Sequence, residues 1–137
     1  MSALDAALAA GRAEAEARMT DQVRLYRQTA DTFDRTTGTT VPGAQTTLYT
    51  GKARVKPVHV SAGEETVAGE REVAGRRYEV HVPWGTPLPD GVRVLPGDRV
   101  GVISSTDTRL VDTVLWVTGA EFGSQATAWR ISVEDRS

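Results

Sequence analysis

Few side chains in this sequence have the types and spacing that an active site requires. The two histidines, His59 and His81, each fall in or beside a predicted strand, with no set of metal-ligating residues nearby. The paired carboxylates Glu64 and Glu65 lie in a glycine-rich segment, where nothing would separate their pKa values for acid–base catalysis. The Gly-x-Ser-x-Gly and His-Glu-x-x-His motifs are absent, and the chain has no cysteine. We therefore expect no catalytic residues, no metal site and no cofactor, and we expect that the protein is not an enzyme.

The most concentrated positive charge is a strip of three bases at alternate positions, Lys52, Arg54 and Lys56. Alternate residues of a β-strand project from the same face. Such a strip could contact a phosphate backbone, an acidic partner or a neighbouring subunit, or it could be a solvated face whose charges discourage edge aggregation. The whole chain has 16 basic and 18 acidic residues, a formal net charge of −2. This balance argues against a general binder of nucleic acid or of membrane surfaces.

Three tryptophans are the largest side chains available for a core or for stacking on nucleic-acid bases. Trp129 is in phase with Ile131 and Val133 along a predicted strand, so we expect it in the core. Trp84 stands in a Pro-Trp-Gly sequence at a strand end and is the best candidate for an exposed aromatic side chain. Packing against a turn is the alternative role for Trp84.

The helix and strands that would position these side chains belong to one domain, because 137 residues suffice for a single modest core. No stretch approaches the roughly twenty apolar residues that span a bilayer, so no membrane partner is expected. Residues 1–19 predict a helical arm, in which Ser2 and Asp5 form a capping box. Two ion pairs one turn apart are expected in it: Arg12 with Glu16, and Glu14 with Arg18. The helix has a narrow apolar stripe, so it either lies on its own domain or protrudes, or it docks on another subunit.

Residues 20–137 predict a mainly β domain, a small antiparallel β-barrel. Alternating apolar patterns predict strands at 21–28, 45–57, 76–82, 92–95, 99–102, 110–118 and 125–133. The threonine-rich segment 31–42 predicts a long hairpin or an extended loop, and Gly51 predicts a bulge or turn. The segment 110–118 is apolar on both faces, so we expect a cover for each, from the closing barrel or from a neighbouring chain.

A long acidic loop is predicted at 59–75, where three glycines are separated by glutamates. Loops of this length within a compact domain are uncommon unless they are functional or disordered. The segment is not a phosphate-binding loop, because no Gly-Lys-Ser or Gly-Lys-Thr follows and the acidic residues would repel phosphate.

In their order and spacing, several segments resemble a family of small proteins of actinobacterial phages and prophages, the head–tail connector or head-closure proteins. The matching segments are Val23–Leu48, Tyr49–Val55, Arg77–Trp84, Pro96–Val100 and Ala126–Glu134. The resemblance implies a head-to-tail stopper, a β-barrel protomer of a homo-oligomeric ring in the virion neck. Such a ring is assembled in the bacterial host cytoplasm, with the portal or adaptor above it and the tail or tail terminator below.

In such proteins a mobile loop closes the channel for double-stranded DNA after packaging. The resemblance makes the acidic loop the candidate gate, and its candidate gating residues are Gly63, Glu64, Glu65, Gly69, Glu70 and Arg71. Lys52, Arg54 and Lys56 are the candidate contacts to a neighbouring subunit or to DNA. The alternative is a small β-barrel binding module that uses the same three bases to bind nucleic acid or a protein partner.

Overall fold

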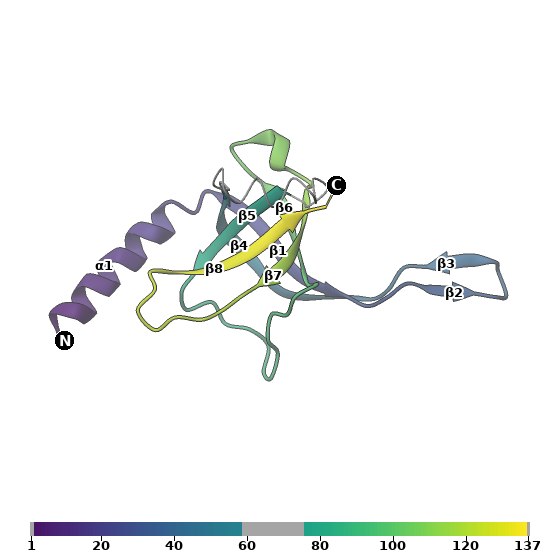
Figure 1. Cartoon of the computed structure of the whole chain (residues 1–137), viewed down its shortest axis with the longest axis horizontal. Helices are drawn as coiled ribbons and strands as arrows, with labels where there is room; N and C mark the ends of the chain where they lie inside the picture. The colour runs from purple at the N-terminus through teal and green to yellow at the C-terminus, as the bar shows by residue number, and fades with distance from the viewer. Residues whose placement is uncertain (1, 59–75, 137) are drawn as a thin grey trace, which may run out of the picture.

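The computed structural model describes residues 2–58 and 76–136, which form a closed antiparallel β-barrel with a helix on one side and a hairpin on the other (Figure 1). The strands follow the order β1-β4-β5-β8-β7-β6 around the barrel, and β6 pairs again with β1. Their bounds are β1 Asp21–Gln28, β4 Gln45–Pro57, β5 Arg76–Pro83, β6 Arg99–Ser104, β7 Val114–Gly119 and β8 Ala128–Asp135. The predicted mainly β barrel with an N-terminal helix is confirmed. The acidic loop 59–75 lies outside the described residues.

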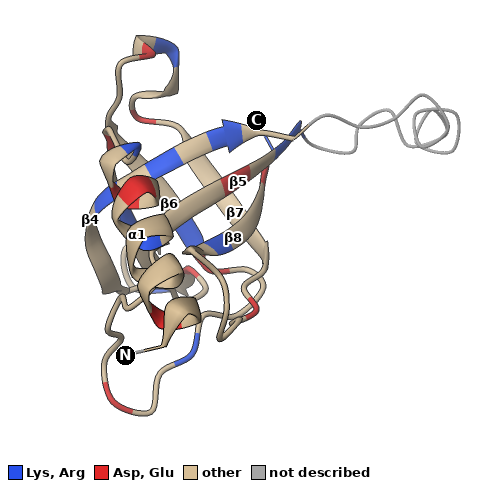
Figure 2. Ribbon diagram, turned by 90° about the vertical axis from the view of Figure 1, so that its left-hand side faces the viewer, with Lys and Arg blue, Asp and Glu red and all other residues tan. Residues whose placement is uncertain are grey.

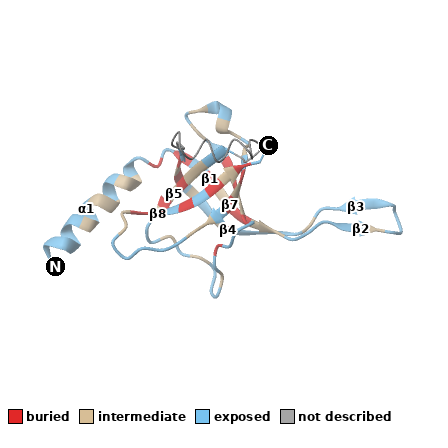
Figure 3. Ribbon diagram, in the orientation of Figure 1, coloured by how far each residue is buried: buried red, intermediate tan, exposed pale blue. Residues whose placement is uncertain are grey.

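The core fills the barrel with branched aliphatic side chains, as the alternating patterns predict. Among the most deeply buried are Val23, Leu25, Val80, Val82, Val100, Leu115 and Ile131. Figure 3 shows that the buried residues cluster on the barrel strands, whereas the helix and the hairpin are exposed or intermediate. Trp129, Ile131 and Val133 are all buried, so the predicted phase of the last strand is confirmed.

The helix α1 spans Ala3–Ala17 and begins with the predicted capping box. The Ser2 hydroxyl accepts from the backbone N–H of Asp5 at 3.0 Å, and the Asp5 carboxylate accepts from the backbone N–H of Ser2 at 3.2 Å. None of the residues of α1 is fully buried. The capping box and the alanine-rich sequence therefore favour the helix, and a few polar contacts described below attach it to the barrel.

The threonine-rich segment forms a hairpin of β2 (Thr32–Asp34) and β3 (Thr39–Val41), which confirms the first of its two predicted forms. It extends well beyond the barrel, on the side opposite α1 (Figure 1). Gly38 closes its turn with a φ of +73°, a conformation that glycine adopts without steric cost.

The predicted bulge at Gly51 is wrong, because Gly51 pairs regularly with Val23 in the β1–β4 ladder. The register instead shifts between Leu25 and Tyr26, which pair with Tyr49 and Thr47. Glycine is needed at position 51 for another reason: a Cβ there would lie 2.7 Å from the Tyr49 hydroxyl oxygen. That hydroxyl donates to the backbone carbonyl of Lys52 at 2.7 Å and so passes over the glycine.

The predicted strand at 92–95 is also wrong. This segment is irregular, although Val94 still packs into the core. Two of its backbone groups bond to side chains: Leu95 N–H donates to the Asp98 carboxylate at 2.8 Å, and the Arg93 carbonyl accepts from Arg27 at 2.6 Å. Turn hydrogen bonds take two more, from Val92 N–H to the Pro89 carbonyl and from Asp98 N–H to the Leu95 carbonyl. Turn-forming residues at both ends of a segment therefore do not by themselves predict a strand between them.

The strand predicted from Leu110 begins only at Val114, because residues 108–110 form a short 3-10 turn and Asp112 has a φ of +68°. Leu115 faces the barrel interior, as expected. Trp116, on the outer face, is flanked by two guanidinium groups of its own chain, while Val114 on the same face is 39% exposed, so a cover from a neighbouring chain stays a prediction. These groups are Arg99, 4.0 Å from the ring centroid, and Arg136, 4.5 Å from it.

Candidate binding surface

The three predicted bases all lie on β4, but they do not form one free strip. Lys52 Nζ lies 3.0 Å from the Glu16 carboxylate of α1 and is neutralised by it. Arg54 and Lys56 instead line a cleft of about 240 Å³ beside α1. Figure 2, which looks onto the helix, shows basic segments on the strands behind it.

The basic residues of this cleft come from four elements, and we name them together the basic cleft: Arg18, Arg54, Lys56, His81 and Arg130. Strand pairing places three of them in one row, because Arg54 pairs with His81 and His81 pairs with Arg130. Within residues 2–58 and 76–136, no ion pair joins the side chains of Arg54, Lys56 or Arg130 to a carboxylate. The cleft therefore offers three unneutralised cations to a ligand.

The histidine at the centre of the basic cleft is neutral at neutral pH. Partial burial is the largest influence on the His81 ring and lowers its pKa below the ordinary value, and the charges of Arg54 and Arg130 lower it further. Glu79, whose carboxylate lies 3.1 Å from Nε2, opposes this shift without reversing it. His81 can therefore act as a hydrogen-bonding group in the cleft, and the arginines and the lysine supply its charge.

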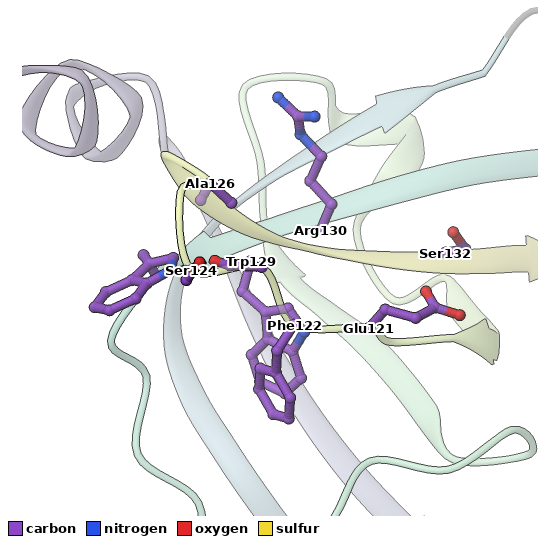
Figure 4. Close-up of a pocket in the computed structure, with 10 residues that line it drawn as sticks. Glu121, Phe122, Ser124, Ala126, Trp129, Arg130 and Ser132 are labelled. Carbon is purple, nitrogen blue, oxygen red and sulfur yellow. Dashed lines mark hydrogen bonds between the residues drawn. The ribbon is translucent and has the colours of Figure 1, made fainter. Parts of the chain in front are cut away.

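A second hollow, of about 550 Å³, adjoins the basic cleft through Ala128 and Arg130, which line both. We call it the aromatic pocket, after the three aromatic side chains in its wall: Trp84, Phe122 and Trp129. The rings of Phe122 and Trp129 stack with centroids 4.8 Å apart and planes inclined by 25° (Figure 4). Phe122 is 62% exposed although it belongs to this stack. A further apolar group could therefore pack on it from outside.

Trp84 and Arg12 connect this pocket to α1. The Trp84 indole N–H donates to the Gly123 carbonyl at 2.8 Å, and the Arg12 guanidinium lies 3.6 Å from the Trp84 ring centroid. The same guanidinium donates to the carbonyls of Ser124 at 2.9 Å and Ala126 at 3.1 Å. Both interpretations of Trp84 thus hold, since it packs on a turn and remains 40% exposed.

These contacts also correct one expected ion pair of the helix. Arg12 is turned toward Trp84 and the loop before β8, so the expected pair with Glu16 does not form. The other expected pair, Glu14 with Arg18, is present at 3.3 Å. The helix was expected to lie on its own domain or protrude, or to dock on another subunit. In the structure, the face of α1 that carries Arg12 lies against its own barrel.

Sequence reasoning missed Phe122 and Arg12 as members of this surface. A phenylalanine between glutamate and glycine in a predicted turn was the available signal, because a turn offers it no core to enter. The candidate gating residues Gly63, Glu64, Glu65, Gly69, Glu70 and Arg71 lie outside the described residues, as does His59. Among the described residues, no three metal-ligating side chains gather as a metal site would require, and no helix is long and apolar enough to cross a bilayer.

Comparison with known proteins places this chain by fold and family. The solution structure of protein SF1141 from Shigella flexneri 2a is 20% identical, covers 86% of this chain and 93% of its own, and superposes with a TM-score of 0.50, which shows a shared fold. No curated protein matches the sequence. The profile of the family of unknown function DUF6093 matches residues 11–134, from the second half of α1 to the residue before the end of β8. The barrel and the half of α1 that carries Arg12 are thus the matched unit, and the chain belongs to the DUF6093 family.

Proposed function

We propose that the protein is a structural subunit of a tailed phage, a head-to-tail stopper that assembles as a homo-oligomeric ring in the virion neck. The ring joins the portal or adaptor to the tail and closes the DNA channel after packaging. The observation that carries the proposal is the pair of arms on opposite sides of a closed barrel (Figure 1). Of the two arms, α1 is attached to its own barrel through Arg12 and Lys52, whereas the hairpin extends away from it, so the hairpin is the arm that assembly would use.

The hairpin arm supports assembly because it exposes apolar surface that its own barrel does not cover. Phe33 is 63% exposed and Val41 is 45% exposed. Burying such a side chain in a partner contributes about 1.5–3 kcal/mol. A neighbouring subunit would supply that cover.

The basic cleft supports a protein contact over a DNA contact at the candidate residues. Lys52 is neutralised by Glu16, and the acidic residue Glu14 lies in the cleft wall beside Arg54 and Lys56. A cleft of about 240 Å³ has room for a single acidic side chain of a partner subunit but not for a DNA duplex. The gating role of the acidic loop stays a prediction of the family resemblance.

Disruption of the gene in the phage or prophage that encodes it tests this function. Particles made without the protein should contain DNA-filled heads and separate tails that fail to join, and the heads should lose DNA on storage. Supplying the wild-type chain from a plasmid should restore tailed particles. Normal yields of infectious tailed particles from the disrupted genome would contradict the proposal.

A second candidate, a β-barrel module that binds nucleic acid, is favoured by the three unneutralised cations of the basic cleft. Fluorescence anisotropy with labelled single- and double-stranded oligonucleotides, over a range of salt concentrations, separates the two candidates. A monomer that binds tightly at moderate salt, and loses binding when Arg54 and Lys56 are both replaced by alanine, would favour the binding module. A genome without portal and tail genes beside this gene would favour it further.

A further inference from the structure

We propose that the aromatic pocket of one copy receives Phe33 from the β2–β3 hairpin of a second copy. The inference rests on the proposed self-assembly and names the contact that holds neighbouring subunits together. It is carried by four features: a presented aromatic side chain, a matching pocket, their separation within one copy, and their complementary charges.

The hairpin presents Phe33 in an ordered setting. Phe33 pairs across the hairpin with Thr40, so these two side chains share one face, while Thr32 and Val41 share the other. The neck of the hairpin is tied by the hydrogen bond from Thr29 N–H to the Ala44 carbonyl at 3.0 Å. Because the arm is already ordered, docking it costs less conformational entropy than docking a loop would.

The aromatic pocket is a suitable receptor for a phenyl ring. Its volume of about 550 Å³ falls in the ordinary range of binding pockets, and its walls include the stacked rings of Phe122 and Trp129 (Figure 4). Phe122 has an exposed surface on which a third ring can stack, in the offset geometry that aromatic pairs prefer. Entry of Phe33 would therefore remove two exposed aromatic side chains from water at once.

Phe33 cannot reach the pocket of its own copy. The hairpin extends from the barrel on the side opposite α1 (Figure 1). The pocket is lined by the loop before β8 and the start of β8, and Arg12 of α1 covers Trp84 in its wall. A contact between these two surfaces in different copies is heterologous, since each copy uses its hairpin toward one neighbour and its pocket toward the other. Repetition of such a contact closes a ring when the rotation between copies permits.

Charges on the two surfaces are complementary. Asp31 and Arg35 stand two residues before and two residues after Phe33 along the hairpin. Asp31 is opposite in charge to Arg130, which lines the pocket, and to Arg12, which borders it over Trp84. Arg35 is opposite in charge to Glu121 in the pocket wall. These pairs would orient the hairpin while Phe33 fills the pocket.

Disulfide trapping between two full-length variants tests the contact. Because the chain has no cysteine of its own, a disulfide can form only between the introduced cysteines. One variant carries Thr40→Cys, beside Phe33 on its face of the hairpin, and the other carries Ser124→Cys in the pocket wall. The two are mixed under mild oxidation, and linked peptides are identified by mass spectrometry. The matched control is Thr32→Cys, which lies on the opposite face of the same hairpin.

The expected product is a disulfide-linked dimer of the Thr40→Cys and Ser124→Cys chains. When the Thr32→Cys chain replaces the Thr40→Cys chain in the mixture, most of this dimer should be lost. Adding Phe33→Ala to the Thr40→Cys chain should abolish the link. Equal linking by the two hairpin cysteines, linking that survives Phe33→Ala, or no linking at concentrations where light scattering detects oligomers would overturn the inference. A chain that stays monomeric and unlinked overturns it too, whereas the neck function is judged separately by the particles made without the protein.

Discussion

Arg27 of β1 holds the buried carboxylate of Asp98 with two hydrogen bonds, 2.8 Å from Nε to Oδ1 and 3.0 Å from Nη2 to Oδ2. The same guanidinium donates to the Arg93 carbonyl, and Asp98 accepts from the Leu95 N–H. The Arg27–Asp98 ion pair thus holds the irregular segment 92–95 in place before β6, and Val94 of this segment packs against the core. It substitutes for the strand pairing that this segment lacks.

Replacing Asp98 with asparagine should therefore destabilise the fold. We expect a loss of about 1.5 kcal/mol, near the low end for hydrogen bonds to a charged group, because Arg27 is itself 37% exposed. Urea unfolding followed by tryptophan fluorescence measures the loss. The matched control is Asp107→Asn, which removes an exposed pair with Arg109 and should change stability little. Equal effects of the two substitutions would contradict this role of Asp98.

Replacing Trp129 with alanine should cost about 3–5 kcal/mol in the free energy of unfolding, because the side chain is buried among the barrel residues. Phe122→Ala is the control, since it removes only the exposed partner of the stack and should cost about 1 kcal/mol or less. Chemical denaturation provides both values. A nearly neutral Trp129→Ala variant would mean that the tryptophan contributes little to the core.

His81 should make the fold less stable in mild acid. Its pKa in the folded chain lies below the unfolded value, so the unfolded chain binds the proton more readily. The stability contributed by the neutral ring is fully present above the unfolded pKa of about 6.5 and is lost as the pH falls through the lowered folded pKa. The charged groups around the ring are Glu14 and Arg18 of α1, Arg54 and Lys56 of β4, Glu79 of β5 and Arg130 of β8.

The measurement compares wild type with His81→Gln in urea unfolding at about pH 7.5 and about pH 5.5. Wild type should lose more stability than the variant on acidification. The second histidine, His59, is present in both chains and cancels in the comparison. A variant with the same pH dependence as wild type, or a wild type that gains stability in acid, would count against the assignment.

Replacing Arg12 with alanine should loosen α1 from the barrel, because its guanidinium bonds two carbonyls and covers Trp84. We expect amide protons of Ala3–Ala17 to exchange faster, by an amount equal to about 1 kcal/mol of lost protection. Arg18→Ala is the control, since within residues 2–58 and 76–136 the one ion pair of the Arg18 side chain is an exposed pair with Glu14. This substitution should leave most of the helix protected. Unchanged exchange in the Arg12→Ala variant would show that other contacts attach the helix.

Local patterns predicted the elements well, because their causes are local. The capping box of Ser2 and Asp5 needs only four residues, and the burial of Trp129, Ile131 and Val133 follows from strand alternation. The threonine-rich hairpin also follows from nearby turn residues.

Contacts between distant segments escaped prediction. The row of Arg54, His81 and Arg130 depends on the register of three strands that are far apart in sequence. Arg12 was expected to pair with a residue one turn away, but the loop before β8 offers it two carbonyls and a tryptophan ring. The strand predicted at 92–95 is wrong because Asp98 and Arg27, which are distant in sequence from each other, bond the Leu95 N–H and the Arg93 carbonyl there.

A cryo-electron microscopy map of the tailed particles that we propose contain this chain tests the central claim most directly. We predict a ring of copies of this barrel at the head–tail junction, with the β2–β3 hairpin of each copy lying against the aromatic pocket of the next. A junction accounted for entirely by other chains, with no density for this barrel, would contradict it.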